Sequence, residues 1–488
     1  MNQTVSLTLD GTLYQRLHAH LFPGDNDEHG AVIAAGIAET PRGTRLLARD
    51  LFLARDGVDY VPGDRGYRAL TAQFVAETSD YCARENLCYL AVHCHGAGDR
   101  VTFSPDDLAS QRRGYPALLD ITKGGPVGAL VFASDAVAGN IWTRESIVPL
   151  SQATVLGMQI HRLYPTPPTR PVYADPIYDR HARLFGDVGQ SILANLKVGI
   201  IGLGGGGSLI NEWLARLGVG HIVAIDFDRV EPTNLPRIVG ATHWDAMTWL
   251  ARQENTWLQR FAHQFARHKV DVARRVARQA NPSIRYDAVV GDVRDEKTAR
   301  LLADVDFLVL AGDSMQSRLI FNSLVHQYLI PGVQIGAKVP IDPTTHQVRD
   351  IYTATNLVLP TPGQGCLQCN GWISPEQLQK EALNAQERRA QRYVDDDEVV
   401  EPSVITLNVL SAGQAANDLL FLFTGLFRQG VQLEHHLNFV QDRQLTVSTP
   451  RMDPHCLDCA STSKSRRARG DRARLPCRQR SVTKNYSH

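Results

Sequence analysis

The sequence has no apolar stretch long enough to cross a membrane. The longest candidate, residues 419–427, falls well short of the roughly 20 residues that a transmembrane helix needs. The first ten residues also lack the basic start and apolar middle of a secretory signal peptide. We therefore expect a cytoplasmic protein without a membrane partner.

The chain also lacks an excess of charge and is poor in cysteine. Its 51 Lys and Arg balance its 51 Asp and Glu, so a nucleic-acid partner is not expected. Four of the 8 cysteines stand in two Cys-x-x-Cys pairs, which favours metal binding over disulfides in a reducing compartment. With 488 residues and 43% hydrophobic content, the chain is long and apolar enough for two or three globular domains.

A glycine-rich turn lies near the middle of the chain. An apolar run at 198–201 enters the turn, a helical segment follows, and a second apolar run ends at Asp226. This order predicts a βαβ unit in which phosphate approaches main-chain N–H groups at a helix start. On its own, the turn favours a dinucleotide-binding dehydrogenase. Its glycines are Gly202, Gly204, Gly205 and Gly207.

The residues that follow the turn change this interpretation. They are, in order, Asp228, Asn234, Arg237, Lys269 and, directly after an apolar strand at 307–310, Asp313. With the glycine turn, this series resembles the adenylyltransferases that activate ubiquitin-like and sulfur-carrier proteins, the ThiF/MoeB/ubiquitin-activating-enzyme superfamily. Any one of these residues could be a surface group, but the ordered set favours adenylation. The resemblance implies a Rossmann-like, ThiF-type adenylation domain at 177–460 that binds ATP and Mg²⁺.

The resemblance also implies a role for each residue. The glycines and Asp228 line the nucleotide site, Asp226 binds the ribose, and Asp313 holds Mg²⁺. Around the phosphates it places Asn234, Arg237 and Lys269. Arg180, in the family's entry segment at 178–186, reaches ATP, often in the partner's site of a dimer, so a homodimer is expected.

The chemistry explains these residue types. In such enzymes the partner's C-terminal glycine carboxylate attacks the α-phosphorus of ATP, which yields an acyl-adenylate and pyrophosphate. The carboxylate is already ionised at neutral pH, so no general base is needed. Charge grows on phosphate oxygens, and fixed cations stabilise it.

A second set of polar residues lies near the N-terminus. A predicted strand at 87–95 ends with His93 and His95, which point to the same face because they are two residues apart. Ser104 and Asp107 follow, and Glu28 precedes an apolar strand.

This set resembles the JAB/MPN (JAMM) metalloprotease pattern and implies such an α/β domain at 1–163. By that resemblance His93, His95 and Asp107 ligate a catalytic Zn²⁺ and leave one position for water. Glu28 would be the general acid/base, and Ser104 would stabilise the oxyanion. The family's proline after the second histidine is replaced by Gly96, and the spacer to Ser104 is one residue longer. The alternative is therefore an inactive docking module.

The two Cys-x-x-Cys pairs supply four thiolates for one tetrahedral zinc with no open position. The sequence thus predicts a structural zinc knuckle in the second domain, a feature that the resemblance supports. Its ligands would be Cys366, Cys369, Cys456 and Cys459.

Three further segments carry predictions. The proline-rich stretch 164–176 is expected to be a semi-rigid linker, and the basic tail 461–488 is expected to be disordered. The tryptophan-rich stretch 240–267 is interpreted as a helical insertion that covers the ATP site or forms a dimer face, or as ordinary core. No cysteine lies between Cys369 and Cys456. The acyl group must then pass to an external thiol, on a conjugating enzyme or sulfur donor, or to Cys477, whose arginine neighbours would lower its pKa.

The leading hypothesis is an enzyme with two sites. The first trims or deconjugates a ubiquitin-like protein, and the second adenylates the exposed C-terminal glycine. This domain pair resembles that of bacterial ubiquitin-like modification systems, some of them tied to phage defence. The alternatives are sulfur-carrier activation for cofactor or cysteine synthesis, and an inactive scaffold that binds a ubiquitin-like partner.

Overall fold

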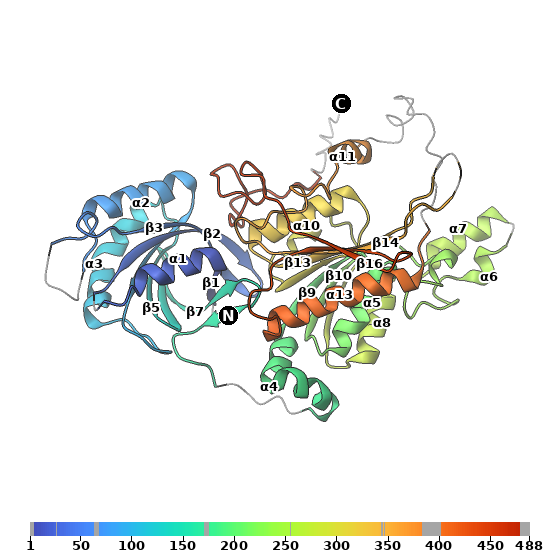
Figure 1. Ribbon diagram of the computed structural model, residues 1–488, viewed down its shortest axis with the longest axis horizontal. Coiled ribbons are helices and arrows are strands. Elements are labelled where there is room, and N and C mark those ends of the chain that lie inside the picture. The colour runs from blue at the N-terminus through green and yellow to red at the C-terminus, as the bar shows by residue number, and fades with distance from the viewer. Residues whose placement is uncertain are drawn as a thin grey trace, which may run out of the picture.

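The computed structural model describes residues 4–25, 27–62, 68–169, 175–253, 255–342, 345, 347–382 and 402–478. They form two α/β units, each built on an eight-stranded sheet, that lie side by side (Figure 1). The mixed α/β fold predicted from the sequence is confirmed. In the described part of the chain, no helix combines the length and the hydropathy of a membrane span.

The first unit, residues 4–163, has the strand order β1-β3-β2-β4-β5-β6-β7-β8, and β1 also pairs with β7, which closes the sheet on itself. Its apolar residues pack inside this sheet and beneath the helices. The strands are β1 (Val5–Asp10), β2 (Gly30–Thr40), β3 (Gly43–Leu53), β4 (Cys88–Cys94), β5 (Val127–Ala133), β6 (Ala136–Trp142), β7 (Ile147–Leu156) and β8 (His161–Leu163), and the helices are α1 (Gly11–Leu21), α2 (Ala72–Glu85) and α3 (Pro105–Ile121).

The second unit, residues 175–460, has the strand order β11-β10-β9-β12-β13-β14-β15-β16, parallel from β11 to β13 and antiparallel after it. Parallel strands joined by helices need cover on both faces, and two separate apolar cores provide it. Its strands are β9 (Lys197–Ile201), β10 (His221–Ile225), β11 (Arg285–Val289), β12 (Phe307–Leu310), β13 (Gly332–Lys338), β14 (Tyr352–Val358), β15 (His435–Phe439) and β16 (Gln444–Ser448).

Helices α5, α8 and α13 pack into one of these cores, and α10 packs into the other. The described helices of the unit are α4 (Asp179–Asn195), α5 (Gly205–Arg216), α6 (Thr248–Ala251), α7 (Thr256–Phe265), α8 (Lys269–Ala280), α9 (Glu296–Arg300), α10 (Met315–Tyr328), α11 (Pro375–Ala382) and α13 (Ile405–Thr424). Residues 170–174 of the predicted linker lie outside the described residues.

The prediction of a disordered tail is wrong for residues 461–478, which we call the C-terminal clasp. Ser465 and Ala468 have no exposed surface, and Arg467 is 3% exposed. Gly470 pairs with Ile37 of β2. The segment is ordered because its arginines meet carboxylates and carbonyls of the first unit, which composition alone does not reveal. Residues 479–488 of the predicted tail lie outside the described residues.

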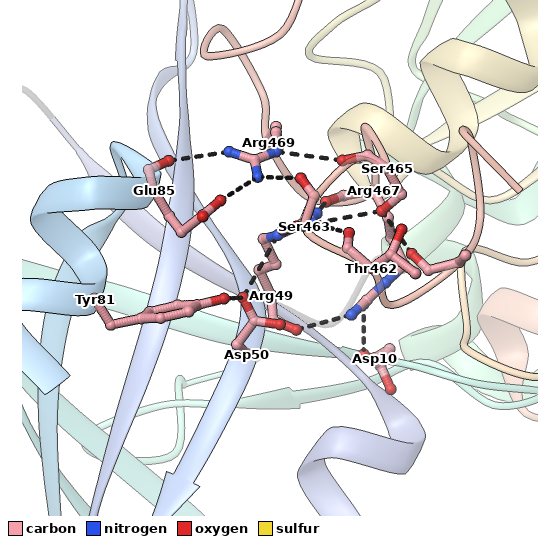
Figure 2. Close-up of polar contacts among 11 residues, drawn as sticks. Asp10, Arg49, Asp50, Tyr81, Glu85, Thr462, Ser463, Ser465, Arg467 and Arg469 are labelled. Carbon is pink, nitrogen blue, oxygen red and sulfur yellow. Dashed lines mark hydrogen bonds and ion pairs between the residues drawn. The ribbon is translucent and has the colours of Figure 1, made fainter. Parts of the chain in front are cut away.

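Arginines of the clasp bind the first unit directly (Figure 2). Arg467 lies 3.3 Å from the Asp10 carboxylate and donates to the Arg49 carbonyl at 2.8 Å, while the Arg49 guanidinium donates to the Arg467 carbonyl. Arg469 donates to the Glu85 carboxylate at 2.7 Å. Burial raises the pKa of Asp10, opposed by the Arg467 charge, and burial lowers the pKa of Arg49 to about 10. Each charge that the clasp buries is thus paired.

The two units also share apolar packing. One buried cluster contains Leu47 and Leu156 of the first unit, Leu329 of the second, and Ala468 and Leu475 of the clasp. The clasp therefore completes a core to which both units contribute.

Candidate functional site

The glycine turn leaves β9 and starts α5 at its N-terminus, as predicted. Gly202 has φ +88°, and a Cβ there would lie 2.9 Å from the Gly312 nitrogen. A Cβ on Gly207 would lie 2.0 Å from the Gly202 carbonyl oxygen. Gly204, the N-cap residue, makes no side-chain hydrogen bond to the helix, so the first N–H groups of α5 can face an anion.

Asp226 ties this turn to the end of β10. Its carboxylate accepts hydrogen bonds from the Leu203 N–H at 2.7 Å and the Asp228 N–H at 2.8 Å. Burial raises the pKa of Asp226, while Lys269 and the two N–H groups act against that rise. A carboxylate has four lone-pair directions, so it keeps capacity for ribose hydroxyls.

Lys269 opens α8, and its ammonium lies 2.7 Å from the Asp228 carboxylate. The Asp228 N–H donates to Asp226, which in turn accepts from Leu203 of the turn, so this pair lies beside the turn. Asn234 is buried, and its side chain accepts from the Glu231 N–H at 3.2 Å. Asn234 therefore shapes the loop after β10, on which the partly exposed Arg237 stands.

Asp313 follows β12 by three residues, next to Gly312, which contacts Gly202. Strands β9, β10 and β12 are parallel neighbours, so their carboxyl ends, with Gly202, Asp226 and Asp313, meet at one edge of the sheet. Asp313 is exposed and free to reach an ion. The structure thus brings most of the predicted nucleotide-site residues together.

Arg180 is the exception within one chain. It stands on α4 two residues after Tyr178, whose ring would lie 3.0 Å from a Cβ on Gly218. Gly218 follows the C-terminus of α5, and the 12 residues of that helix put it about 18 Å from the glycine turn. Arg180 therefore lies at the opposite end of α5 from the turn.

The N-terminal polar set also converges. His93 stands on β4 and His95 directly follows it, and their Nε2 atoms lie 3.4 and 3.3 Å from the two oxygens of Asp107. One ligand atom from each residue lies within 4.8 Å of the others. The Nε2 atom of His93 is buried without a hydrogen-bond partner in the described structure, which is the state of an imidazole arranged for a metal ion.

The structure explains Gly96 and shows what Ser104 does. Gly96 has φ +50°, a value that proline cannot adopt. Ser104 caps α3, donating to the Asp107 carboxylate at 2.8 Å and accepting the Asp107 N–H at 3.1 Å. Its hydroxyl therefore fixes Asp107, and the predicted oxyanion role would need it to leave these bonds.

Glu28 faces the same three residues. Its carboxylate lies 3.6 Å from Nε2 of His95, and burial raises its pKa against the attraction of both histidines. Burial also acts to raise the pKa of Asp107, but the nearby His93 imidazole and the hydrogen bonds from Ser104 hold that pKa well below its usual value. The site thus combines an acid that retains its proton more readily with a carboxylate that stays ionised.

Sequence reasoning missed the residues that hold Glu28 in place. The Tyr60 hydroxyl accepts the Gly30 N–H at 2.8 Å, and the Cys94 sulfur accepts the His29 N–H at 3.2 Å. His29, next to Glu28 in the sequence, is 4% exposed and bonded to Asp25 at 2.9 Å. No local signal marks Tyr60, because it lies 30 residues from its partner.

The four cysteines of the predicted knuckle form one cluster. Sulfur–sulfur distances are 3.6 Å for Cys366–Cys369, Cys366–Cys456 and Cys369–Cys459. Four thiolates at the usual zinc–sulfur length form a tetrahedron with edges of about 3.8 Å, so the cluster fits a zinc ion. Asp458, between two of these cysteines, accepts from Asn322 of α10 at 2.7 Å.

Cys477 does not have the predicted reactivity. Its side chain packs against the second unit's core, and burial, with Glu296 and Asp295 nearby, raises its pKa to about 12. The arginines beside it in sequence do not offset this. A thiol that stays protonated is a poor acyl acceptor.

The aromatic side chains of the insertion at 240–267 lie outside the core, although Ala246 joins a small buried cluster. Trp244 is 77% and Trp257 66% exposed, and Trp257 stacks along α7 on Phe261. The core interpretation is therefore wrong for these aromatic side chains.

Comparisons with known proteins identify the family of the second unit. A model of the ThiF family matches residues 178–460. A tRNA threonylcarbamoyladenosine dehydratase from Escherichia coli is 30% identical over 172 residues, or 35% of this chain and 57% of that protein. A molybdopterin-synthase adenylyltransferase from Haemophilus influenzae is 26% identical over 171 residues, or 33% of this chain and 63% of that protein. The chain thus spans less than two thirds of either relative. A crystal structure of E. coli MccB with ATP aligns with a TM-score of 0.43 and 19% identity, over 59% of this chain and 75% of that one.

Proposed function

The chain belongs to the ThiF family, and we propose that its second unit uses ATP and Mg²⁺ to adenylate the C-terminal glycine of a ubiquitin-like or sulfur-carrier protein. The observation that carries this proposal is the meeting of the glycine turn, Asp226 and Asp313 at one edge of the sheet. A nicotinamide enzyme would need no metal-holding carboxylate there.

Each residue has a task in this reaction. Main-chain N–H groups at the start of α5 bind phosphate oxygens, and Asp226 accepts from the ribose hydroxyls. Arg237 and Lys269 neutralise charge that grows on the phosphates, and Lys269 is released from Asp228 to do so. Asp313 holds Mg²⁺, which supplies further positive charge. In a homodimer, the partner subunit's Arg180 would join them.

The first unit, we propose, is a zinc-dependent peptidase that trims the partner or removes it from a conjugate. This rests on the convergence of His93, His95 and Asp107, and on the buried Nε2 of His93, which lies 3.4 Å from the Asp107 carboxylate without a hydrogen bond in the described structure. His93, His95 and Asp107 would hold Zn²⁺, which acidifies a bound water. Glu28 takes up a proton at its carboxylate and returns it to the leaving amine.

ATP–pyrophosphate exchange tests the adenylation. Purified protein with a carrier that ends in Gly-Gly should exchange labelled pyrophosphate into ATP, and the same carrier without its last glycine should not support exchange. No exchange with any such carrier, despite bound ATP, would favour the inactive scaffold.

The acceptor of the acyl group separates the two partner classes. Because Cys477 is partly buried and its pKa is raised, an external thiol should receive the acyl group, on a conjugating enzyme or on a sulfur donor. Capture by a protein amine would identify a modification system, and capture by sulfide would identify sulfur-carrier activation. The peptidase-like first unit favours the first outcome.

Glu28→Gln should abolish cleavage of an extended carrier, with a loss of about 10²–10⁴-fold, because the amide cannot take the proton. Glu28 is not among the three proposed zinc ligands, so the variant should keep the wild-type content of about two zinc ions per chain. Cleavage is followed by mass spectrometry and zinc by atomic emission. A variant that still cleaves would remove Glu28 from the mechanism.

A further inference from the structure

The two proposed sites face away from each other. Glu28 lies two residues before β2, and the first residue of β2, Gly30, pairs with His93 of β4. The other end of β2 turns at Arg42, whose guanidinium donates to the Asp306 carboxylate at 2.9 Å. Asp306 accepts the Lys197 N–H at the amino end of β9. The first unit thus meets the amino ends of the parallel strands, whereas the nucleotide site lies at their carboxyl ends.

Strand lengths give the separation. The 11 residues of β2 span about 37 Å, and the 5 residues of β9 add about 16 Å beyond the contact. The two sites are therefore on the order of 40 Å apart or more. Figure 1 shows α3, whose first turn carries Asp107, at the end of the first unit away from the second unit.

The clasp keeps this arrangement fixed. Its buried pair Arg467–Asp10 and its outer pair Arg469–Glu85 hold the first unit from one side (Figure 2). Just before the clasp, Cys459 joins the cysteine cluster, and Asp458 bonds to α10. A swing of one unit toward the other would expose the shared core and leave these charges unpaired, which is strongly unfavourable.

We propose that a partner cleaved at the first site leaves the protein and rebinds from solution before it is adenylated at the second. This inference rests on the proposed function. To reach both sites while its globular part stayed bound, the partner would need an extended tail of about 12 residues. A folded domain of ubiquitin size, about 11 Å in radius of gyration, cannot cover both sites at once.

Isotope dilution tests the proposal. The probe is a labelled Gly-Gly carrier with a short C-terminal extension, supplied with ATP and about a tenfold excess of the unlabelled carrier already ending in Gly-Gly. Labelled adenylate should fall about tenfold, because a released partner rebinds in competition with the pool. Undiminished label would mean direct transfer, within one chain or between two copies, and would overturn the proposal.

A mixture of variants gives a second reading. Glu28→Gln and Asp313→Asn, combined in equal amounts, should convert extended carrier to adenylate at the rate of wild-type protein at half the total concentration. A mixture much slower than this would contradict release. Cleavage and pyrophosphate exchange are also assayed separately on the wild type. If either activity is absent there, the proposed function itself is wrong, and this inference is wrong with it.

Discussion

Asp313→Asn is expected to reduce ATP–pyrophosphate exchange by about 10²–10³-fold or more, the usual cost of losing one group that stabilises transition-state charge. The carboxylate stands at the carboxyl end of β12 next to the glycine turn. An amide keeps its size but binds Mg²⁺ poorly, because the hard cation prefers charged oxygen ligands. The measurement is the initial rate of exchange at saturating ATP.

The fold should be unaffected, because Asp313 is exposed and surface substitutions rarely change stability by more than about 0.5 kcal/mol. Asp187→Asn on α4 is the matched control, since it removes the same charge from another exposed site and should leave exchange at the wild-type rate. Cleavage at the first site should persist in both variants. Exchange that survived in Asp313→Asn would remove this residue from the nucleotide site.

Those parts of the molecule that depend on short-range patterns could be predicted from the sequence. The glycine turn is one, because only glycine tolerates the contacts at Gly202 and Gly207. The pair His93 and His95 is another, because strand geometry places both on one face. The mixed α/β fold follows from apolar runs alternating with helical patterns.

What could not be predicted depends on partners far apart in the chain. The arginines of the clasp indicate a solvated tail until Asp10, about 460 positions away, is known to be buried beside Arg467. Cys477 is similar, because its sequence neighbours are basic but its spatial neighbours are acidic. Composition reports the charge of a segment, whereas burial and pairing are decided by the rest of the fold.

Arg467→Ala should lower the free energy of unfolding by about 3–5 kcal/mol, because it leaves the Asp10 carboxylate buried without its counter-charge. Asp10 has no exposed surface, so water cannot replace the lost partner. The Arg49 carbonyl also loses a hydrogen bond of 2.8 Å. Urea unfolding at pH 7, followed by circular dichroism, measures the change, and two separate transitions would show that the units no longer unfold together.

The pH dependence of this loss identifies its origin. Burial raises the pKa of Asp10 in the folded protein, and Arg467 opposes that rise. Removal of the arginine raises the folded-state pKa further, so the variant's folded state binds a proton more readily than its unfolded state. Stability then falls as pH rises above the unfolded value of about 3.9. The deficit of Arg467→Ala should therefore be largest near neutral pH and should shrink toward pH 4.

Two further variants separate charge from packing. Arg474→Ala removes an exposed arginine of the same clasp and should change stability by no more than about 0.5 kcal/mol. Asp10→Asn combined with Arg467→Met should recover much of the loss. The asparagine side chain can still accept the hydrogen bond from the Leu13 N–H that caps α1, and the buried charge is gone. If the double variant were as unstable as Arg467→Ala at every pH, the clasp would act through shape and its bonds to carbonyls, and the Asp10 pair would contribute little.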